Sequence, residues 1–186
     1  MNEFQDKVSK QQLIDVAIEL FSKKGYHNTS MSNIADACSI KKPSIYHHVD
    51  SRVDLLIAVV EQVTQRFADE VLLVLVEATL TAREKLQKMA EGIEAFFVQR
   101  QGDSLIAKLV YEVSSASTEL QALLKRFFDQ WVGALESLIK EYYGDNSKQI
   151  AEDSVAHLEG ALLLSSINQD KGIFQRAINH MLLLIP

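Results

Sequence analysis

A short run of basic, aromatic and histidine side chains carries the residue types best suited to nucleic-acid chemistry. It covers residues 41–48 and reads Lys-Lys-Pro-Ser-Ile-Tyr-His-His. Ammonium and imidazole groups bind phosphates and the acceptor edges of bases, and a tyrosine hydroxyl can reach a phosphate oxygen. A pair of lysines is most often simply a solvated surface, but Tyr46-His47-His48 after Lys42-Pro43 on a short helix favours a surface that contacts DNA.

The same run must lie on a helix for these groups to act together. Pro43 fits only a first helical turn, so we expect a helix from Lys42 to about Val49. On such a helix Ile45 and Val49 face inward, and the polar and aromatic side chains share the outward face.

Histidines also raise the question of metal. His47 and His48 are adjacent, so on a helix their rings point about 100° apart, and no third ligand is near in sequence. His157 has Asp153 four residues before it, a spacing more typical of an ion pair or a lone polar group than of half a metal site. We predict no metal and no cofactor.

Hydrophobic periodicity predicts an all-α chain of about nine helices. Ser9 with Gln12 forms a capping box for the first, and Ser30 is a natural N-cap for the second. A long fourth helix follows Ser51, with an apolar stripe as far as Val74. The expected helices cover about 9–24, 30–38, 42–49, 51–74, 81–97, 105–113, 117–142, 147–168 and 173–185.

Composition agrees with an all-α fold and indicates the cellular compartment. The 186 residues include only seven Gly and two Pro, too few for a sheet of many short strands. The single Cys38 allows no intramolecular disulfide and indicates a reducing compartment. The strongly apolar stretch 71–76 is far shorter than a membrane span, and residues 1–10 do not resemble a secretory signal. We expect a cytoplasmic protein with no membrane partner.

Charge is unevenly distributed along the chain. Residues 1–52 hold seven Lys or Arg and six Asp or Glu, which gives a net charge of +1. The remaining residues carry a net charge of −7, and the two parts together give the −6 of the whole chain. This asymmetry suggests a near-neutral contact module joined to an acidic body.

The segment 30–49, SMSNIADACSIKKPSIYHHV, followed by Ser51-Arg52 and Leu55-Leu56, closely resembles the DNA-binding domain of TetR-family transcriptional repressors. The resemblance covers about residues 9–67. It implies a TetR-type domain over 7–67, with the helix-turn-helix at about 30–49, joined through the long fourth helix to a helical ligand-binding and dimerisation domain over 68–186.

The resemblance also implies individual roles. Ser30 would cap the second helix and touch phosphate, and Ser32 would sit at the groove edge. Lys42 and His47 would lie nearest base edges, while phosphates would be contacted by Tyr46, His48 and Arg52. The complete expected DNA-binding set is Ser30, Ser32, Lys41, Lys42, Pro43, Tyr46, His47, His48 and Arg52.

Three positions depart from the family pattern. Ser39 replaces the usual turn glycine, Lys41 a common serine cap, and Val49 a common phenylalanine. Ser39 must reach a left-handed conformation at a cost of about 1 kcal/mol. Lys41 gives up a cap but adds a cation beside Lys42.

The body offers a candidate effector site. Bundle interiors commonly bind apolar ligands, although aromatic side chains at helical spacing are first of all core. The candidate ligand-binding residues are Phe67, Met89, Ile93, Phe97, Leu109, Phe127, Trp131 and His157.

The last two helices have broad apolar faces. These faces fit either an internal core or a two-fold four-helix interface with a second chain, which the resemblance favours. The candidate interface residues are Leu158, Ala161, Leu162, Ser165, Phe174, Ile178 and Met181.

The sequence thus predicts a homodimeric, ligand-responsive regulator, most simply a repressor, that binds a palindromic double-stranded DNA operator and is released by an unidentified small-molecule effector. One rival is an architectural DNA-binding protein of this fold without an effector. The other is an enzyme carrying a helix-turn-helix, against which stands the lack of a phosphate loop, a His-Glu-x-x-His motif or a nucleophile paired with a base. We expect no enzymatic activity.

Overall fold

The computed structural model describes residues 8–98, 105–113 and 117–186, so Lys7, the predicted start of the first domain, lies outside it. The described chain is helical and contains no strand. Within it, no helix combines the length and the apolar composition that crossing a bilayer requires.

The chain forms two compact units, which differ from the predicted domains. The head unit comprises residues 1–63 and 108–123, and the body unit comprises residues 64–107 and 124–186. The predicted boundary at residue 67 places 108–113 and 118–123 in the second domain, whereas the contacts of the chain group them with the N-terminal helices.

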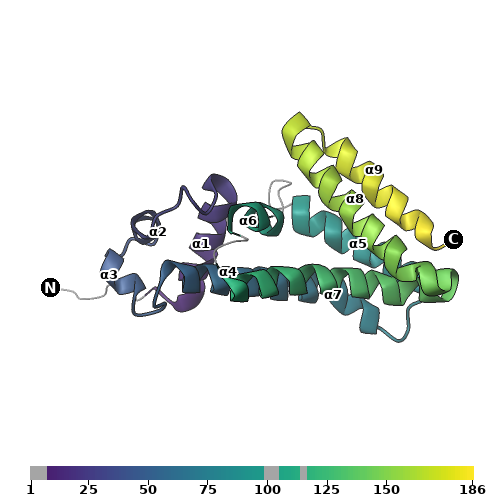
Figure 1. The fold of residues 1–186 in the computed structure, drawn as a ribbon, viewed down its shortest axis with the longest axis horizontal. Helices are drawn as coiled ribbons and strands as arrows, with labels where there is room; N and C mark the ends of the chain where they lie inside the picture. Colours follow the sequence, from purple (N-terminus) through teal and green to yellow (C-terminus); the bar gives the residue numbers. More distant parts are fainter. Residues whose placement is uncertain (1–7, 99–104, 114–116) are drawn as a thin grey trace. The chain divides into compact units, whose positions relative to one another are not determined.

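The helices follow the predicted order (Figure 1). They are α1 Lys10–Lys24, α2 Met31–Ala37, α3 Lys42–Ile45, α4 Arg52–Phe67, α5 Ala82–Val98, α6 Leu105–Val113, α7 Thr118–Tyr143, α8 Ser147–Asn168 and α9 Lys171–Met181. The short elements are η1 Ala68–Leu72, η2 Leu73–Val76, η3 Gly144–Asn146 and η4 Leu182–Leu184.

The head unit is built around the apolar stripes of α1, α2 and α4. The Ser9–Gln12 capping box starts α1, as predicted, and Gly25 ends it with φ +80°. The fully buried Phe21, Ile34 and Leu55 represent the three stripes, one from each helix. Their burial supplies most of the stabilisation that such short helices need.

Helix α3 is shorter than predicted, because it ends at Ile45 rather than near Val49. Backbone bonds nevertheless continue the winding, since His48 N donates to the Ile45 carbonyl at 2.9 Å and Val49 N to the same oxygen at 3.2 Å. Ile45 and Val49 are both buried, as the predicted inward face requires.

The fourth helix also differs from the prediction. Regular α-helix ends at Phe67, and the chain then winds as the π-helical η1 and the 3₁₀-helical η2. Val71 in η1 stays buried opposite Gly92 of α5, where a Cβ atom would lie 2.9 Å from the Glu70 carbonyl oxygen. The wider π turn keeps Val71 inside the body unit, whereas Leu73 and Val76 are exposed.

Helices α8 and α9 pack side by side in the body unit (Figure 1). Buried Ser165 fixes the turn between them, because its hydroxyl donates to the Asp170 carbonyl at 2.8 Å and accepts the Phe174 N–H at 3.1 Å. Gln169 takes the left-handed conformation at φ +52° to end α8.

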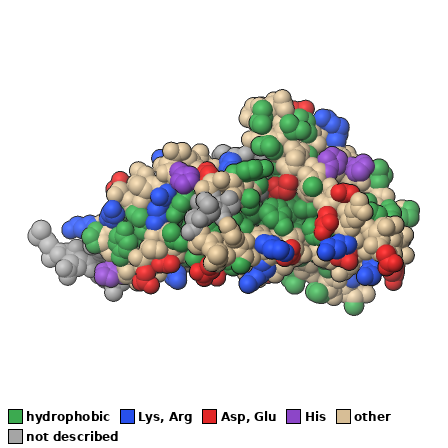
Figure 2. Space-filling model, viewed as in Figure 1, with side chains coloured by type: hydrophobic (Ala, Val, Ile, Leu, Met, Phe, Trp, Pro, Cys, Tyr) green, Lys and Arg blue, Asp and Glu red, His purple; other side chains and the backbone are tan. Residues whose placement is uncertain are grey.

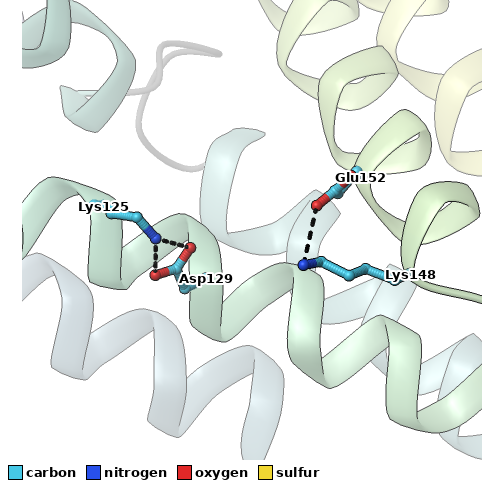
Figure 3. A network of polar contacts seen from close by, with 4 residues as sticks. All are labelled: Lys125, Asp129, Lys148 and Glu152. Atoms are coloured by element: carbon cyan, nitrogen blue, oxygen red, sulfur yellow. Dashed lines mark hydrogen bonds and ion pairs between the residues drawn. The ribbon is translucent and has the colours of Figure 1, made fainter.

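Exposed ion pairs mark outer faces of α7 and α8. Lys125 lies 2.7 Å from Asp129 Oδ1, and Lys148 lies 3.9 Å from Glu152 (Figure 3). Such solvated pairs contribute only about 0.3–0.5 kcal/mol each. The core of this unit therefore rests on burial, with Trp131 of α7 fully enclosed.

Candidate nucleic-acid interface

The start of α2 is a complete cap. The Ser30 hydroxyl accepts the Asn33 N–H at 3.1 Å, and the Asn33 side-chain oxygen accepts the Ser30 N–H at 2.9 Å. Asn33 was not among the predicted site residues, although its place three positions after Ser30 is the signal for a capping box. Ser30 and Ser32 are both exposed, so this helix start is open to solvent.

The turn between α2 and α3 contains the substitution of glycine by serine. Ser39 has φ +55°, in the left-handed region, and its N–H donates to the Asp36 carbonyl at 3.0 Å. Lys41 begins α3 without a side-chain cap, and Pro43 lies in its first turn. The sequence predicted a left-handed serine at position 39, and the turn contains one. It also predicted that Lys41 would not cap α3, and the Lys41 side chain makes no capping bond.

The outward face of α3 and the turn after it present the predicted DNA-reading groups. Lys41, Lys42, Pro43, Tyr46 and His47 are exposed, and Tyr46 retains 44% of its accessible surface. The large exposed ring beside two ammonium groups differs from an ordinary charged surface. It matches the mixed hydrogen-bonding and apolar contacts that a major-groove reader makes.

Two of the predicted residues are less available. His48 is half-buried. Arg52 directs its guanidinium onto Tyr26, donating to the Tyr26 carbonyl and stacking with Cζ 4.0 Å from the ring centroid. Its buried Nε has no hydrogen-bond partner among the described residues. The predicted phosphate clamp is thus engaged with its own chain here, and no local sequence pattern links residues 26 and 52.

Four of the predicted ligand-binding side chains are neighbours in the body unit. The Phe67 ring centroid lies 5.0 Å from that of Trp131 and 4.9 Å from that of Phe127, and Phe97 stacks on Trp131 at 6.0 Å. Ile93 is fully buried in the same unit. We call Phe67, Phe96, Phe97, Phe127 and Trp131 the aromatic cluster.

The remaining three ligand-binding candidates have different environments. Met89 is buried in the body unit, whereas Leu109 belongs to the head unit. His157 is exposed on α8, and its ring centroid is 5.4 Å from that of His180 on α9, so it lines no interior site within the described chain. The described residues hold no group of three His, Cys, Asp or Glu side chains able to bind a metal ion.

The residues predicted for the dimer interface lie inside the single chain. All seven are buried within the single chain, at 8% exposure or less: Leu158, Ala161, Leu162, Ser165, Phe174, Ile178 and Met181. Phe174 packs on Phe97 with ring centroids 6.0 Å apart. In the single chain these side chains contribute to the packing of α8 on α9 and to the core of the body unit.

A second apolar face of α8 is exposed instead. Leu163, Leu164 and Ile167 are 56%, 51% and 69% exposed, and Gly160 opens on empty space one turn before Leu163. Figure 2 shows hydrophobic side chains gathered at the end of α8 that leads into α9. We call Gly160, Leu163, Leu164 and Ile167 the outer α8 stripe.

A capped helix-turn-helix with an exposed basic and aromatic face, continued by a helical bundle, defines a DNA-binding regulator. Residues 13–59 match the family described as bacterial regulatory proteins, tetR family. Residues 82–180 match the LmrA/YxaF-like transcriptional regulator C-terminal domain. The chain therefore belongs to the TetR family of transcriptional regulators.

Individual relatives agree with this assignment. The chain is 34% identical over 101 residues to the transcriptional activator FasR of Mycolicibacterium smegmatis, covering 54% of this chain but only 44% of FasR. It is 25% identical over 177 residues to the negative transcriptional regulator of the biofilm operon icaADBC, IcaR, of Staphylococcus epidermidis, covering 91% of both chains. A TetR regulator structure from Legionella pneumophila matches with a TM-score of 0.85 at 24% identity, covering 100% of this chain and 99% of that one.

Proposed function

We propose that this regulator is a homodimeric repressor of the cytoplasm, which binds a near-palindromic operator and releases it when a small-molecule effector binds the body unit. The observation that carries the DNA-binding part is the exposed face formed by Lys41, Lys42, Pro43, Tyr46 and His47 beside the open start of α2. Repression is favoured over activation because the relative that aligns along 91% of both chains is a negative regulator, whereas FasR, an activator, aligns over a shorter part.

Each contact on that face has a chemical rationale. Lys42 and His47 can donate to guanine O6 and N7, and Tyr46 can reach phosphate or pack on a thymine methyl group. Ser30 and Ser32 offer hydroxyls and helix-start N–H groups to a phosphate. One recognition helix of this size reads only a few base pairs, so useful specificity requires a second copy on an adjacent half-site.

The outer α8 stripe supports the dimer. Its large exposed side chains together with Gly160 allow a helix from a second chain to approach closely, and a two-fold axis would pair the stripe with itself. Leu183 in η4, after α9, is another large apolar side chain left exposed, at 74%. This assignment replaces the buried residues that the sequence suggested.

The aromatic cluster supports an effector site. Trp131 is fully buried, and its indole N–H has no hydrogen-bond partner among the described residues. A ligand with an apolar ring and one acceptor would provide the missing bond, which is worth about 1–3 kcal/mol when a buried donor is otherwise unsatisfied. A tenfold loss of operator affinity needs about 1.4 kcal/mol of coupling, so one such contact is sufficient if it forms in only one state.

Selection from a random duplex library tests the function directly. We expect the wild-type protein to enrich an inverted repeat whose half-sites lie about one helical turn apart, and sedimentation to show a dimer on the selected duplex. Enrichment of a single asymmetric site would contradict the homodimer. Enrichment of no sequence would contradict specific operator binding.

A further inference from the structure

Two side chains of α6 hold the end of α1 and the residues that follow it. Glu112 Oε2 accepts the backbone N–H of Tyr26 at 2.7 Å and that of His27 at 3.1 Å. The Glu112 carbonyl oxygen lies 2.8 Å from His27 Nε2, and Lys108 Nζ donates to the Ser22 carbonyl at 3.2 Å. All five residues belong to the head unit, and we call this set of contacts the α6 clasp.

The clasp satisfies backbone groups that α1 leaves unpaired. Gly25 N donates to the Phe21 carbonyl and so ends the helix, after which Tyr26 N and His27 N have no helical acceptor. A carboxylate that receives both makes charge-assisted bonds, which are stronger than bonds between neutral groups. The Lys108 ammonium lies at the carbonyl end of α1, where the helix dipole favours a cation.

Gly25 shows how closely the carboxylate approaches. A Cβ atom at this position would lie 2.6 Å from Glu112 Oε1, well inside van der Waals contact. Its φ of +80° also disfavours any other residue. The connection is therefore shaped to admit a side chain from α6.

The clasped connection leads directly into the DNA-reading surface. On its other side Arg52 donates to the Tyr26 carbonyl, and buried Thr29 donates its hydroxyl to the Gly25 carbonyl at 2.8 Å. Ser30, the N-cap of α2, is the next residue. Only residues 27–29 separate Tyr26 from Ser30, and the Thr29 N–H donates to the Tyr26 carbonyl at 3.1 Å, so we expect a displacement of Tyr26 to reach the start of α2.

We propose that Glu112 is a positioning residue for DNA recognition, which fixes the start of α2 by holding the backbone of Tyr26 and His27. The inference rests on the proposed operator binding and adds α6 to the elements that set the geometry of the reading surface. Lys108 and Glu112 both lie in the part of α6 that belongs to the head unit, so the proposed contact lies within a single unit.

Three variants of Glu112 distinguish the effect of its hydrogen-bond acceptor from the effect of its negative charge, and a fourth variant is a control. Glu112→Ala removes both bonds, and Glu112→Asp keeps the charge but is one methylene too short to reach both N–H groups. Glu112→Gln keeps an acceptor oxygen of the same reach. Glu61→Ala removes another carboxylate of the head unit, one exposed on α4, and serves as the matched control.

The first measurement needs no DNA. Hydrogen exchange at the Tyr26 and His27 amides should quicken about tenfold in Glu112→Ala and Glu112→Asp, and change less than about threefold in Glu112→Gln and the control. Unchanged exchange in both shortened variants would overturn the clasp itself. Circular dichroism checks the fold, and Glu112→Asp carries the test if the alanine variant does not fold.

The second measurement uses the duplex that the wild-type protein selects, with a scrambled duplex beside it. We expect Glu112→Ala and Glu112→Asp to lose about tenfold in affinity for the selected duplex only, and Glu112→Gln to recover the wild-type value within about threefold. Faster exchange with unchanged discrimination would overturn the positioning role while leaving the operator function intact. A wild-type protein that selects no duplex would instead overturn the operator function, and the positioning role with it.

Discussion

The guanidinium of Arg52 lies over the ring of Tyr26, with Cζ 4.0 Å from the centroid, while the same group donates to the Tyr26 carbonyl. Desolvation raises the pKa of the Tyr26 hydroxyl, and the nearby positive charge of Arg52 opposes that rise. The pair joins the start of α4 to the connection between α1 and α2. It makes Arg52 a structural group of the head unit in this state.

Arg52→Ala should therefore act on stability before it acts on DNA. We expect the free energy of unfolding to fall by about 1–2 kcal/mol, from the lost stacking and hydrogen bond. Urea denaturation measures this change. The plot of log operator affinity against log salt concentration should have the same slope as for the wild-type protein. A slope smaller in magnitude by about one would show that Arg52 contacts a phosphate, as the sequence suggested.

Lys42→Ala is the matched change on the exposed face. Unfolding should be unaffected, because the side chain is exposed. Discrimination at one base pair should relax by about 1–3 kcal/mol if Lys42 reads a base edge. Binding isotherms on the selected duplex and its single-base variants measure it, and an equal loss on every duplex would assign Lys42 to phosphate instead.

Ser39→Gly should stabilise the head unit. The left-handed conformation costs serine about 1 kcal/mol and glycine almost nothing, while the greater freedom of glycine in the unfolded chain cancels part of the gain. We expect a net rise of about 0.5 kcal/mol in thermal or urea unfolding. Ser39→Val should shift stability the other way, and a loss in the glycine variant would show that the turn depends on the serine side chain.

Adjacent substitutions on α8 distinguish its two apolar faces. Leu163→Glu places a charge on the outer α8 stripe, so we expect folded monomers in sedimentation. Leu162→Glu buries the charge between α8 and α9, so we expect loss of the fold at a cost of several kcal/mol. A dimeric Leu163→Glu protein would remove the stripe from the interface.

Cys38 should react slowly with alkylating reagents. Burial raises the pKa of its thiol, so the thiolate fraction at pH 8 is below that of a free cysteine. The rate with iodoacetamide should level off at a higher pH in the folded protein than in the urea-unfolded protein. The urea-unfolded protein provides the reference, and equal rates in the two states would contradict the shift.

Local patterns in the sequence predicted the elements of the reading surface well. The caps at Ser9 and Ser30, the turn at Ser39 and the outward set from Lys41 to His47 all follow from spacing within a few residues. Helix α3 ended early because hydrogen-bonded turns cover residues 46–48 without regular α-helix, a difference that periodicity does not detect.

Contacts between distant residues could not be predicted in this way. Glu112 meets Tyr26 across 86 positions, and no periodic signal connects them. Helix α8 is apolar on two faces, so its pattern does not tell which face meets α9. The residue predicted for the interface, Leu162, is buried within the chain, whereas its neighbour Leu163 is exposed.

The division of the chain has a consequence for building hybrid regulators. The head unit is discontinuous: its second segment, 108–123, contains the last six residues of α6 and the first six of α7. A chimera that joins residues 1–67 to a foreign body would leave Tyr26 and His27 without their acceptor. Transplanting the head unit therefore requires two exchanged segments, or else a recipient whose own sixth helix supplies a carboxylate at the position of Glu112.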